Sequence, residues 1–131
     1  MLLCDAAEES GGKLYILGGG WSVIRVPEVP TSMALAIKMS IPWDQANQPH
    51  QIIATLLTED GDPVEQDAGP VIVEAQAEIG RPAGIKPGTP LDMPFVLKFQ
   101  NLMLKAGGYV WELDVAGTTM ARAPFRVLEA P

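Results

Sequence analysis

Alternation of apolar and polar residues is the strongest pattern along this chain, and a period of two predicts half-buried β-strands. In the segment "TSMALAIKMSI" (31–41), every second residue from Met33 to Ile41 is large and apolar. The segments that repeat this period, or are apolar on both faces, are "HQIIATLL" (50–57), "PVIVEAQAEIG" (70–80), "LDMPFVLKFQ" (91–100), "YVWELDVAG" (109–117) and "MARAPFRVL" (120–128). No segment shows a helical stripe longer than about two turns.

Stretches that favour turns separate these predicted strands. Glycine and aspartate, which tolerate a positive φ, occur in the turn segments "EDGD" (59–62), "AGG" (106–108) and "AGT" (116–118). Two short segments, "DAAEE" (5–9) and "WDQAN" (43–47), are weak candidates for single helical turns. We therefore expect an all-β chain: one immunoglobulin-like antiparallel β-sandwich of seven to nine strands over residues 1–131.

Tyr109 supports this fold class. It follows Gly107 and Gly108 and begins an alternating segment. In immunoglobulin-like sandwiches, a tyrosine near the start of a late strand holds a corner of the fold. Many β-sandwiches share the pattern, so it indicates a fold and not a function.

The run Gly18–Gly20 in "LYILGGGW" raises the question of a phosphate-binding loop. Such a loop needs a helix after the glycines, whose free N–H groups meet the anion. Here "WSVIRVPEVP" follows, with β-branched residues and prolines that disfavour a helix, and no Walker lysine is present. We interpret the run as a flexible turn or bulge between strands at 14–17 and 21–26.

Charge and cysteine content exclude some partners and suggest a compartment. The net charge of −7 works against nucleic acids and anionic membranes, because both are bound through clusters of Lys and Arg. Cys4 is the only cysteine, which rules out an intramolecular disulfide and fits a reducing compartment. The N-terminal segment lacks a basic region before its apolar residues, and we expect a cytoplasmic protein without a signal peptide.

Few residues suit catalysis or metal binding. His50 is the only histidine, and none of the four serines lies in a G-x-S-x-G turn. A pair of Cys4 and His50 is formally possible, although Cys4 lies in an apolar segment where a thiol is usually a small hydrophobic residue. The carboxylates of "EDGD" could serve Ca²⁺, but a turn that satisfies its own backbone is the simpler interpretation. We predict no metal, no cofactor and no enzymatic activity.

Two sequence features indicate candidate binding residues. Trp21 directly follows the glycine run, and "PWDQANQPHQ" (42–51) places Trp43, Asp44, Asn47 and His50 between prolines. Rigid loops on a sandwich are common places for binding surfaces. The alternative is structural: either tryptophan could cover the core, and His50 could bond to Asp44 or to a backbone carbonyl.

The predicted outward faces carry more apolar residues than a solvated sheet needs. These candidate interface residues are Ile53, Ile72, Val96 and Val110. Either a loop of the chain covers them or another subunit does. Self-association, with a homodimer as its simplest form, is the hypothesis that follows.

Several stretches resemble a family of small bacterial proteins to which no reaction, cofactor or catalytic residue has been assigned. They are "LCDAAEESGGKLYILGGGW", "PWDQANQPHQI" followed by "EDGDPV", "GRPAG" with a later "PG", and "GGYVWELDVAGTTMARAPFRV". The resemblance covers nearly the whole chain and implies a unit of about this length. It also implies that Trp21, Trp43, Asn47 and His50 belong to a shared pattern.

Three functional hypotheses remain from the sequence. The first is a non-catalytic binding or assembly module that associates with a protein partner or with itself. The second is a sandwich that binds a small molecule or a metal at the end lined by Gly18–Trp21, Trp43 and His50. The third is a small hydrolase that uses His50 with Asp44 or Cys4.

Overall fold

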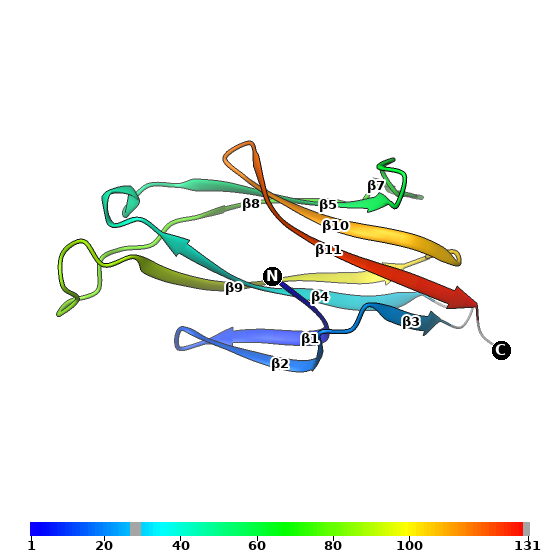
Figure 1. Cartoon of the computed structure of the whole chain (residues 1–131), viewed down its shortest axis with the longest axis horizontal. Helices are drawn as coiled ribbons and strands as arrows, with labels where there is room; N and C mark the ends of the chain where they lie inside the picture. Colours follow the sequence, from blue (N-terminus) through cyan, green and yellow to red (C-terminus); the bar gives the residue numbers. More distant parts are fainter. Residues whose placement is uncertain (27–29, 130–131) are drawn as a thin grey trace.

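The computed structural model describes residues 1–26 and 30–129, and these residues form an all-β fold (Figure 1). The expected fold class is confirmed. Eleven strands and one 3-10 turn, Trp43–Gln45, are present in the described part of the chain. The prediction of seven to nine strands is too low, partly because β6 (Glu65–Gln66) and β7 (Gly69–Pro70) are too short to show alternation.

The strands form two main sheets and a two-stranded ribbon of β6 and β7. The first sheet has, in spatial order, β2 (Lys13–Gly19), β1 (Leu2–Ser10), β4 (Thr31–Ile41) and β9 (Leu91–Leu102). The second has β3 (Val23–Val26), β11 (Thr118–Glu129), β10 (Gly107–Val115), β5 (His50–Thr58) and β8 (Ile72–Ala77). All neighbours in these sheets are antiparallel except β3 and β11, which are parallel.

The core lies between the two sheets and contains the residues that the alternation predicts. Trp111 of β10 is fully buried, and the centroid of its ring lies 4.0 Å from the ring centroid of Phe99 on β9. Its indole N–H donates to the Met33 sulfur at 3.3 Å, so the one polar atom of this side chain is satisfied inside the core. Leu35 and Ile37 continue the same buried row along β4.

Tyr109 holds the corner between β9 and β10, as the sequence predicts. Its hydroxyl donates to the backbone oxygen of Lys105 at 2.7 Å, and its ring stacks on Phe125 at 5.5 Å. Burial raises the pKa of the Tyr109 phenol. The immunoglobulin-like connectivity itself stays a prediction.

Two predicted turns are confirmed. Ala116 and Gly117, with φ of 51° and 83°, connect Val115 to its partner Thr118 in a two-residue hairpin between β10 and β11. The "EDGD" turn follows β5 and is closed by its own backbone, because the Gly61 N–H donates to the Thr58 oxygen at 2.9 Å.

One local prediction is wrong, and a second holds only in part. The segment "DAAEE" is not helical but belongs to β1, because pairing with β2 supplies hydrogen bonds that an isolated turn lacks. The glycine run does connect two strands, as predicted, but these strands do not pair with each other. Gly18 and Gly19 end β2, and the chain then crosses to the other sheet, where β3 pairs with β11. The segment "WDQAN", by contrast, does contain one 3-10 turn.

Candidate functional site

The five candidate binding residues do not form one site. Trp21 packs edge-to-face on Phe125, with ring centroids 5.9 Å apart. Phe125 is paired with Tyr109, which is paired with Thr58 at the last residue of β5. His50 begins the same strand, so Trp21 and His50 lie at opposite ends of the sandwich. The end site that combined the Gly18–Trp21 turn with Trp43 and His50 is therefore not assembled.

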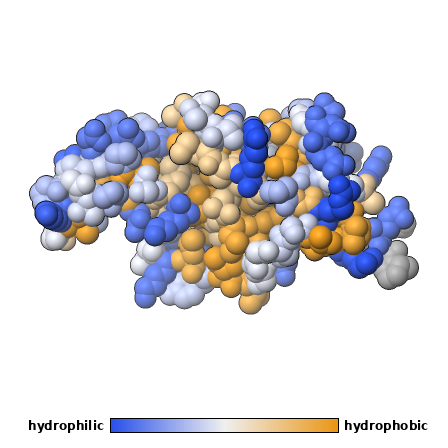
Figure 2. Space-filling view, viewed as in Figure 1, coloured by the Kyte–Doolittle hydropathy of each residue, from blue (hydrophilic) through white to orange (hydrophobic). Residues whose placement is uncertain are grey.

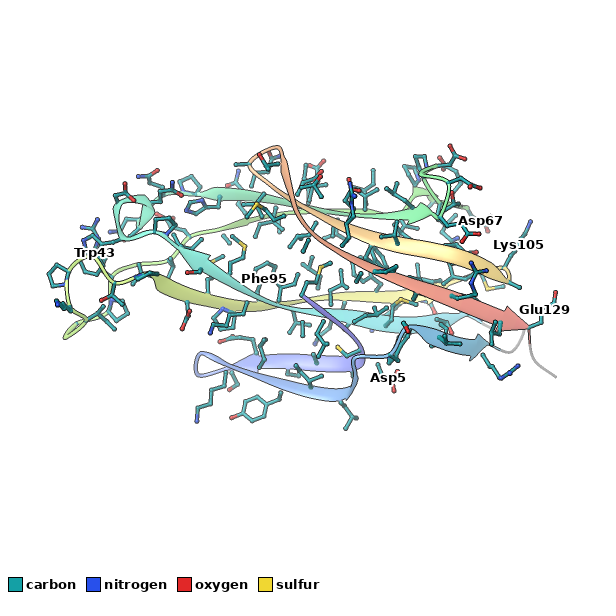
Figure 3. The ribbon with its side chains drawn as sticks, in the orientation of Figure 1. Asp5, Trp43, Asp67, Phe95, Lys105 and Glu129 are labelled. Carbon is teal, nitrogen blue, oxygen red and sulfur yellow. The ribbon has the colours of Figure 1, made fainter. Side chains whose placement is uncertain are left out.

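Trp43 is part of a contact that fixes two loops. The Arg81 guanidinium lies 4.6 Å from the centre of the Trp43 ring and donates to the Trp43 backbone oxygen at 2.8 Å. Figure 3 shows Trp43 at the end of the molecule where these loops meet. The contact stabilises the connection between β8 and β9.

Asp44 and Asn47 serve the same loop. The backbone oxygen of Asp44, whose side chain is exposed, accepts from Gln48 at 3.3 Å. Asn47 has a positive φ of 59°, and its N–H donates to the Ile79 oxygen at 2.8 Å. Asparagine tolerates this backbone conformation better than most residues, which gives Asn47 a structural role.

His50 lines a cleft of about 490 Å³ between the sheets. Its Nε2 lies 3.1 Å from the Gln45 backbone oxygen, and the ring is half-buried. Met39 and Met120 line the same cleft, and no carboxylate does. Asp44 is not hydrogen-bonded to His50 within the described residues.

Cys4 lies in a different part of the molecule. It is fully buried, and its thiol is 3.4 Å from the Ala34 backbone oxygen, to which it donates. Burial raises the pKa of the Cys4 thiol, and the nearby Asp5 charge raises it further. A thiol held in its protonated form is a poor nucleophile, and it shares no cleft with His50.

No metal centre is visible in residues 1–26 and 30–129, because no three His, Cys, Asp or Glu residues gather closely enough. In the "EDGD" turn, Glu59 instead forms an ion pair with Arg126 at 2.6 Å. The described part of the chain also contains no helix with the length and apolar character that a membrane crossing requires.

The four candidate interface residues lie on different surfaces. Ile53 and Val110 are half-buried on the outer face of the second sheet, and Ile72 is 44% exposed on the edge strand β8. Val96 belongs to the first sheet and packs against a small cluster that the N-terminal hairpin covers. For Val96, the chain itself supplies much of the expected cover.

That hairpin, formed by β1 and β2, is the feature that the sequence interpretation missed. Its turn is Gly11–Gly12, with φ of 59° and 77°, between the paired residues Ser10 and Lys13. A second cluster joins the hairpin to the outer face of the first sheet; its members are Cys4, Ala7, Ala34, Ala36, Leu14 and Val96. Glu8 forms an ion pair with Lys98 of β9. "SGGK" is the signal that predicts this turn, since two glycines between strands favour a type I′ hairpin.

The hairpin also carries an exposed apolar run. Tyr15, Ile16 and Leu17 are 57%, 41% and 72% exposed. Figure 2 shows apolar surface along the lower edge of the molecule, where Figure 1 places β1 and β2. We call these three residues the hairpin patch.

A groove of about 500 Å³ adjoins the hairpin patch, and all three patch residues line it. Lys98 and Phe99 of β9 also line this groove. Asp5 and Glu8 add carboxylates to the groove, and Figure 3 places Asp5 at the base of the hairpin. Three consecutive exposed apolar residues beside a groove are typical of an interaction surface.

Comparison with known proteins gives a family but no relative of known activity. Neither the curated proteins nor the solved structures include a match to this chain. A family model, described as a family of unknown function (DUF6941), matches residues 1–128. Because this match covers almost the entire sequence, the chain belongs to that family of unknown function.

Proposed function

We propose that this protein is a non-catalytic assembly module whose binding surface is the hairpin patch. The observation that carries the proposal is the exposure of three consecutive apolar residues, Tyr15 to Leu17, beside a groove. A solvated strand normally alternates, with polar residues on its open face. An exposed apolar strand gains free energy when another protein surface removes it from water.

The charged and nucleophilic residues support a binding role over catalysis. A catalytic site usually perturbs the pKa of the groups that move protons. Cys4 and Tyr109 have raised pKa values, but burial in the packed structure explains both. Cys4 is buried in the cluster between the hairpin and the first sheet, and Tyr109 at the corner between β9 and β10. The lone buried Cys4 also suits the cytoplasmic location that we include in the proposal.

Light scattering after size-exclusion chromatography tests this function. We expect the wild-type chain to form a dimer or larger assembly at micromolar concentration. Leu17→Lys places a charge in the hairpin patch and should shift the mass toward the monomer. Ile72→Lys is the matched control, because Ile72 is also an exposed apolar residue on an edge strand. An identical mass for wild type and Leu17→Lys would contradict the hairpin patch as the assembly surface.

A second candidate function rests on the His50 cleft, which has a suitable volume and an apolar lining for a small ligand. Met39 and Met120 would let it adapt to different shapes. Binding of the fluorescent apolar probe anilinonaphthalene sulfonate tests it. Ala121→Trp, which fills the cleft, should weaken the signal more than Leu17→Lys does, because the hairpin patch offers the probe a second apolar surface. If the filled variant binds the probe as well as the wild type, this candidate is wrong.

A further inference from the structure

The edge of β2 is open and lacks the usual protection. In the described strands, β2 ends the first sheet and pairs only with β1. An edge strand presents unpaired N–H and C=O groups, and natural proteins usually protect such edges with proline, charge or a bulge. The segment "LYIL" (14–17) has no proline and no charged residue. It is therefore a ready partner for another strand.

The other three sheet edges differ from β2 in this respect. β9 contains Pro94, which has no N–H to offer, and Asn101 with a positive φ of 59°. β8 has six residues and carries Glu74, and β3 has four residues, one of them Arg25. Among the four edges of the two main sheets, β2 has its charged residue, Lys13, and its positive-φ residue, Gly18, only near its ends, so the stretch "LYIL" between them is uninterrupted.

The charge distribution favours a second copy of the chain at this edge. A net charge of −7 makes two copies repel each other over most of their surfaces. The stretch from Gly11 to Val26 is an exception, because it contains Lys13 and Arg25 but no carboxylate. Two copies that meet along β2 therefore bring together strands without an acidic side chain of their own, and the nearest carboxylates are those of the neighbouring strand β1, among them Asp5, Glu8 and Glu9.

Asp5 and Lys13 provide complementary charges at the two ends of this strand. The Asp5 carboxylate occupies space that glycine leaves open, since a Cβ on Gly18 would overlap it. Lys13 stands at the other end of β2, at the hairpin turn. Neither side chain forms an ion pair within the described residues.

From these observations we infer that the partner of the hairpin patch is a second copy of this chain, paired antiparallel along β2. This inference rests on the proposed function and specifies its partner. The positive φ of Gly18 ends the regular strand, which leaves residues 13–17 for pairing. A two-fold axis then places Tyr15 opposite Tyr15 of the second copy, and Lys13 opposite Leu17. Each Lys13 lies beside the Gly18 of the other copy, within reach of its Asp5.

Disulfide trapping tests the register directly. Residues opposite each other in antiparallel strands have Cα atoms about 4.5–5.5 Å apart, which suits a disulfide. Under mild oxidation, Tyr15→Cys should form a covalent dimer rapidly, as measured by intact mass. Ile72→Cys is the control on another exposed edge and should react at least about tenfold more slowly, since no symmetric partner lies opposite it. The wild type, with only the buried Cys4, is the blank.

Charge reversal gives a second, independent test. Lys13→Glu and Asp5→Lys should each weaken dimerisation by about tenfold, because each replaces two attractive contacts with repulsive ones. The double variant should recover most of the wild-type dissociation constant. Two losses that add without recovery would overturn the Lys13–Asp5 contact and the register.

The outcomes separate this inference from the proposed function. If Leu17→Lys abolishes the dimer but Tyr15→Cys crosslinks no faster than Ile72→Cys, the hairpin patch stands and the strand pairing is wrong. If the chain is a monomer at every concentration, a second copy is not the partner, and the open edge belongs to an extended segment of a different protein. Rapid Tyr15→Cys crosslinking together with charge-swap recovery supports the inference.

Discussion

The two sheets differ in what covers their outer faces. On the first sheet, β4 turns the small residues Ala34 and Ala36 outward, and the chain's own hairpin covers them. On the second sheet the outer face is open and carries ion pairs such as Glu112–Arg122. Small apolar residues permit the close approach of another layer, whereas charged residues require contact with water.

A residue that faces outward from a sheet can be as deeply buried as a core residue when another part of the chain covers it. Ala34 and Ala36 are as deeply buried as the core residues beside them on β4. The hairpin that buries these alanines leaves three of its own apolar residues exposed, namely Tyr15, Ile16 and Leu17. The first sheet therefore has a second, smaller apolar layer whose outer surface is itself exposed.

The largest expected effect comes from a charge placed on each outer face. Ala34→Lys puts an ammonium group between β4 and the hairpin and should lower the free energy of unfolding by about 3 kcal/mol or more. Thr55→Lys, on the open face opposite Glu112, should change it by less than about 0.5 kcal/mol. Chemical denaturation of both variants measures the difference. Equal effects would show that the hairpin does not cover Ala34.

The corner that joins the sheets should be the next most sensitive place. Tyr109→Phe removes the hydrogen bond to Lys105 and should cost about 1–1.5 kcal/mol. Tyr15→Phe, at an exposed tyrosine, is the control and should cost almost nothing.

The same residue gives a pH dependence with a definite sign. Burial raises the Tyr109 pKa in the folded state, so the folded chain holds this proton more tightly than the unfolded chain. The stabilisation is complete below the ordinary tyrosine pKa of 10.0 and is lost as the pH rises through the raised pKa. This alkaline decrease should be smaller in Tyr109→Phe. Identical pH profiles above pH 10.0 would contradict the assignment.

A smaller effect should report on the attachment of the hairpin. Gly12→Ala forces a side chain into a φ of 77° and should cost about 1 kcal/mol, which loosens the hairpin turn. Alkylation of Cys4 should then become about fivefold faster, because a 1.4 kcal/mol change is a factor of ten. Gly88→Ala is the control, since its φ is 90° but it lies in the loop before β9. If both variants accelerate alkylation equally, the hairpin does not shield Cys4.

Surface ion pairs should contribute least on either face. Arg122→Gln on the second sheet and Lys98→Gln beneath the hairpin each remove one exposed pair and should cost about 0.5 kcal/mol or less. Thermal unfolding at low and high salt checks this. A cost above about 1 kcal/mol for Lys98→Gln alone would mean that charge, and not apolar packing, attaches the hairpin.

The sequence predicts the strands whose one face is buried and whose other face is polar. Strands β10 and β11 are of this kind, because their alternating apolar residues, such as Leu113 and Val127, face the core. Local pattern cannot show that β3 leaves the neighbourhood of β2 and pairs with β11, because that choice depends on contacts distant in the sequence. Ala34 and Ala36 do not show in the sequence that the hairpin covers them, since small residues suit both water and a second layer.

The candidate site illustrates the same limit. "SGGK" carries enough local information to predict the hairpin turn, whereas the longer run Gly18–Gly20 is the more conspicuous glycine signal. Trp21 and Trp43 are both near turns, but the sheet topology places them at opposite ends. Single residues were therefore predictable as structural features, and their grouping was not.

Hydrogen exchange of the β2 amides at two protein concentrations tests the central claim most directly. If the hairpin patch assembles by strand pairing, amides within residues 13–17 should exchange more slowly at high concentration, while those of the β8 edge should not change. Equal exchange rates in β2 at both concentrations, under conditions where the mass shows a dimer, would contradict the account.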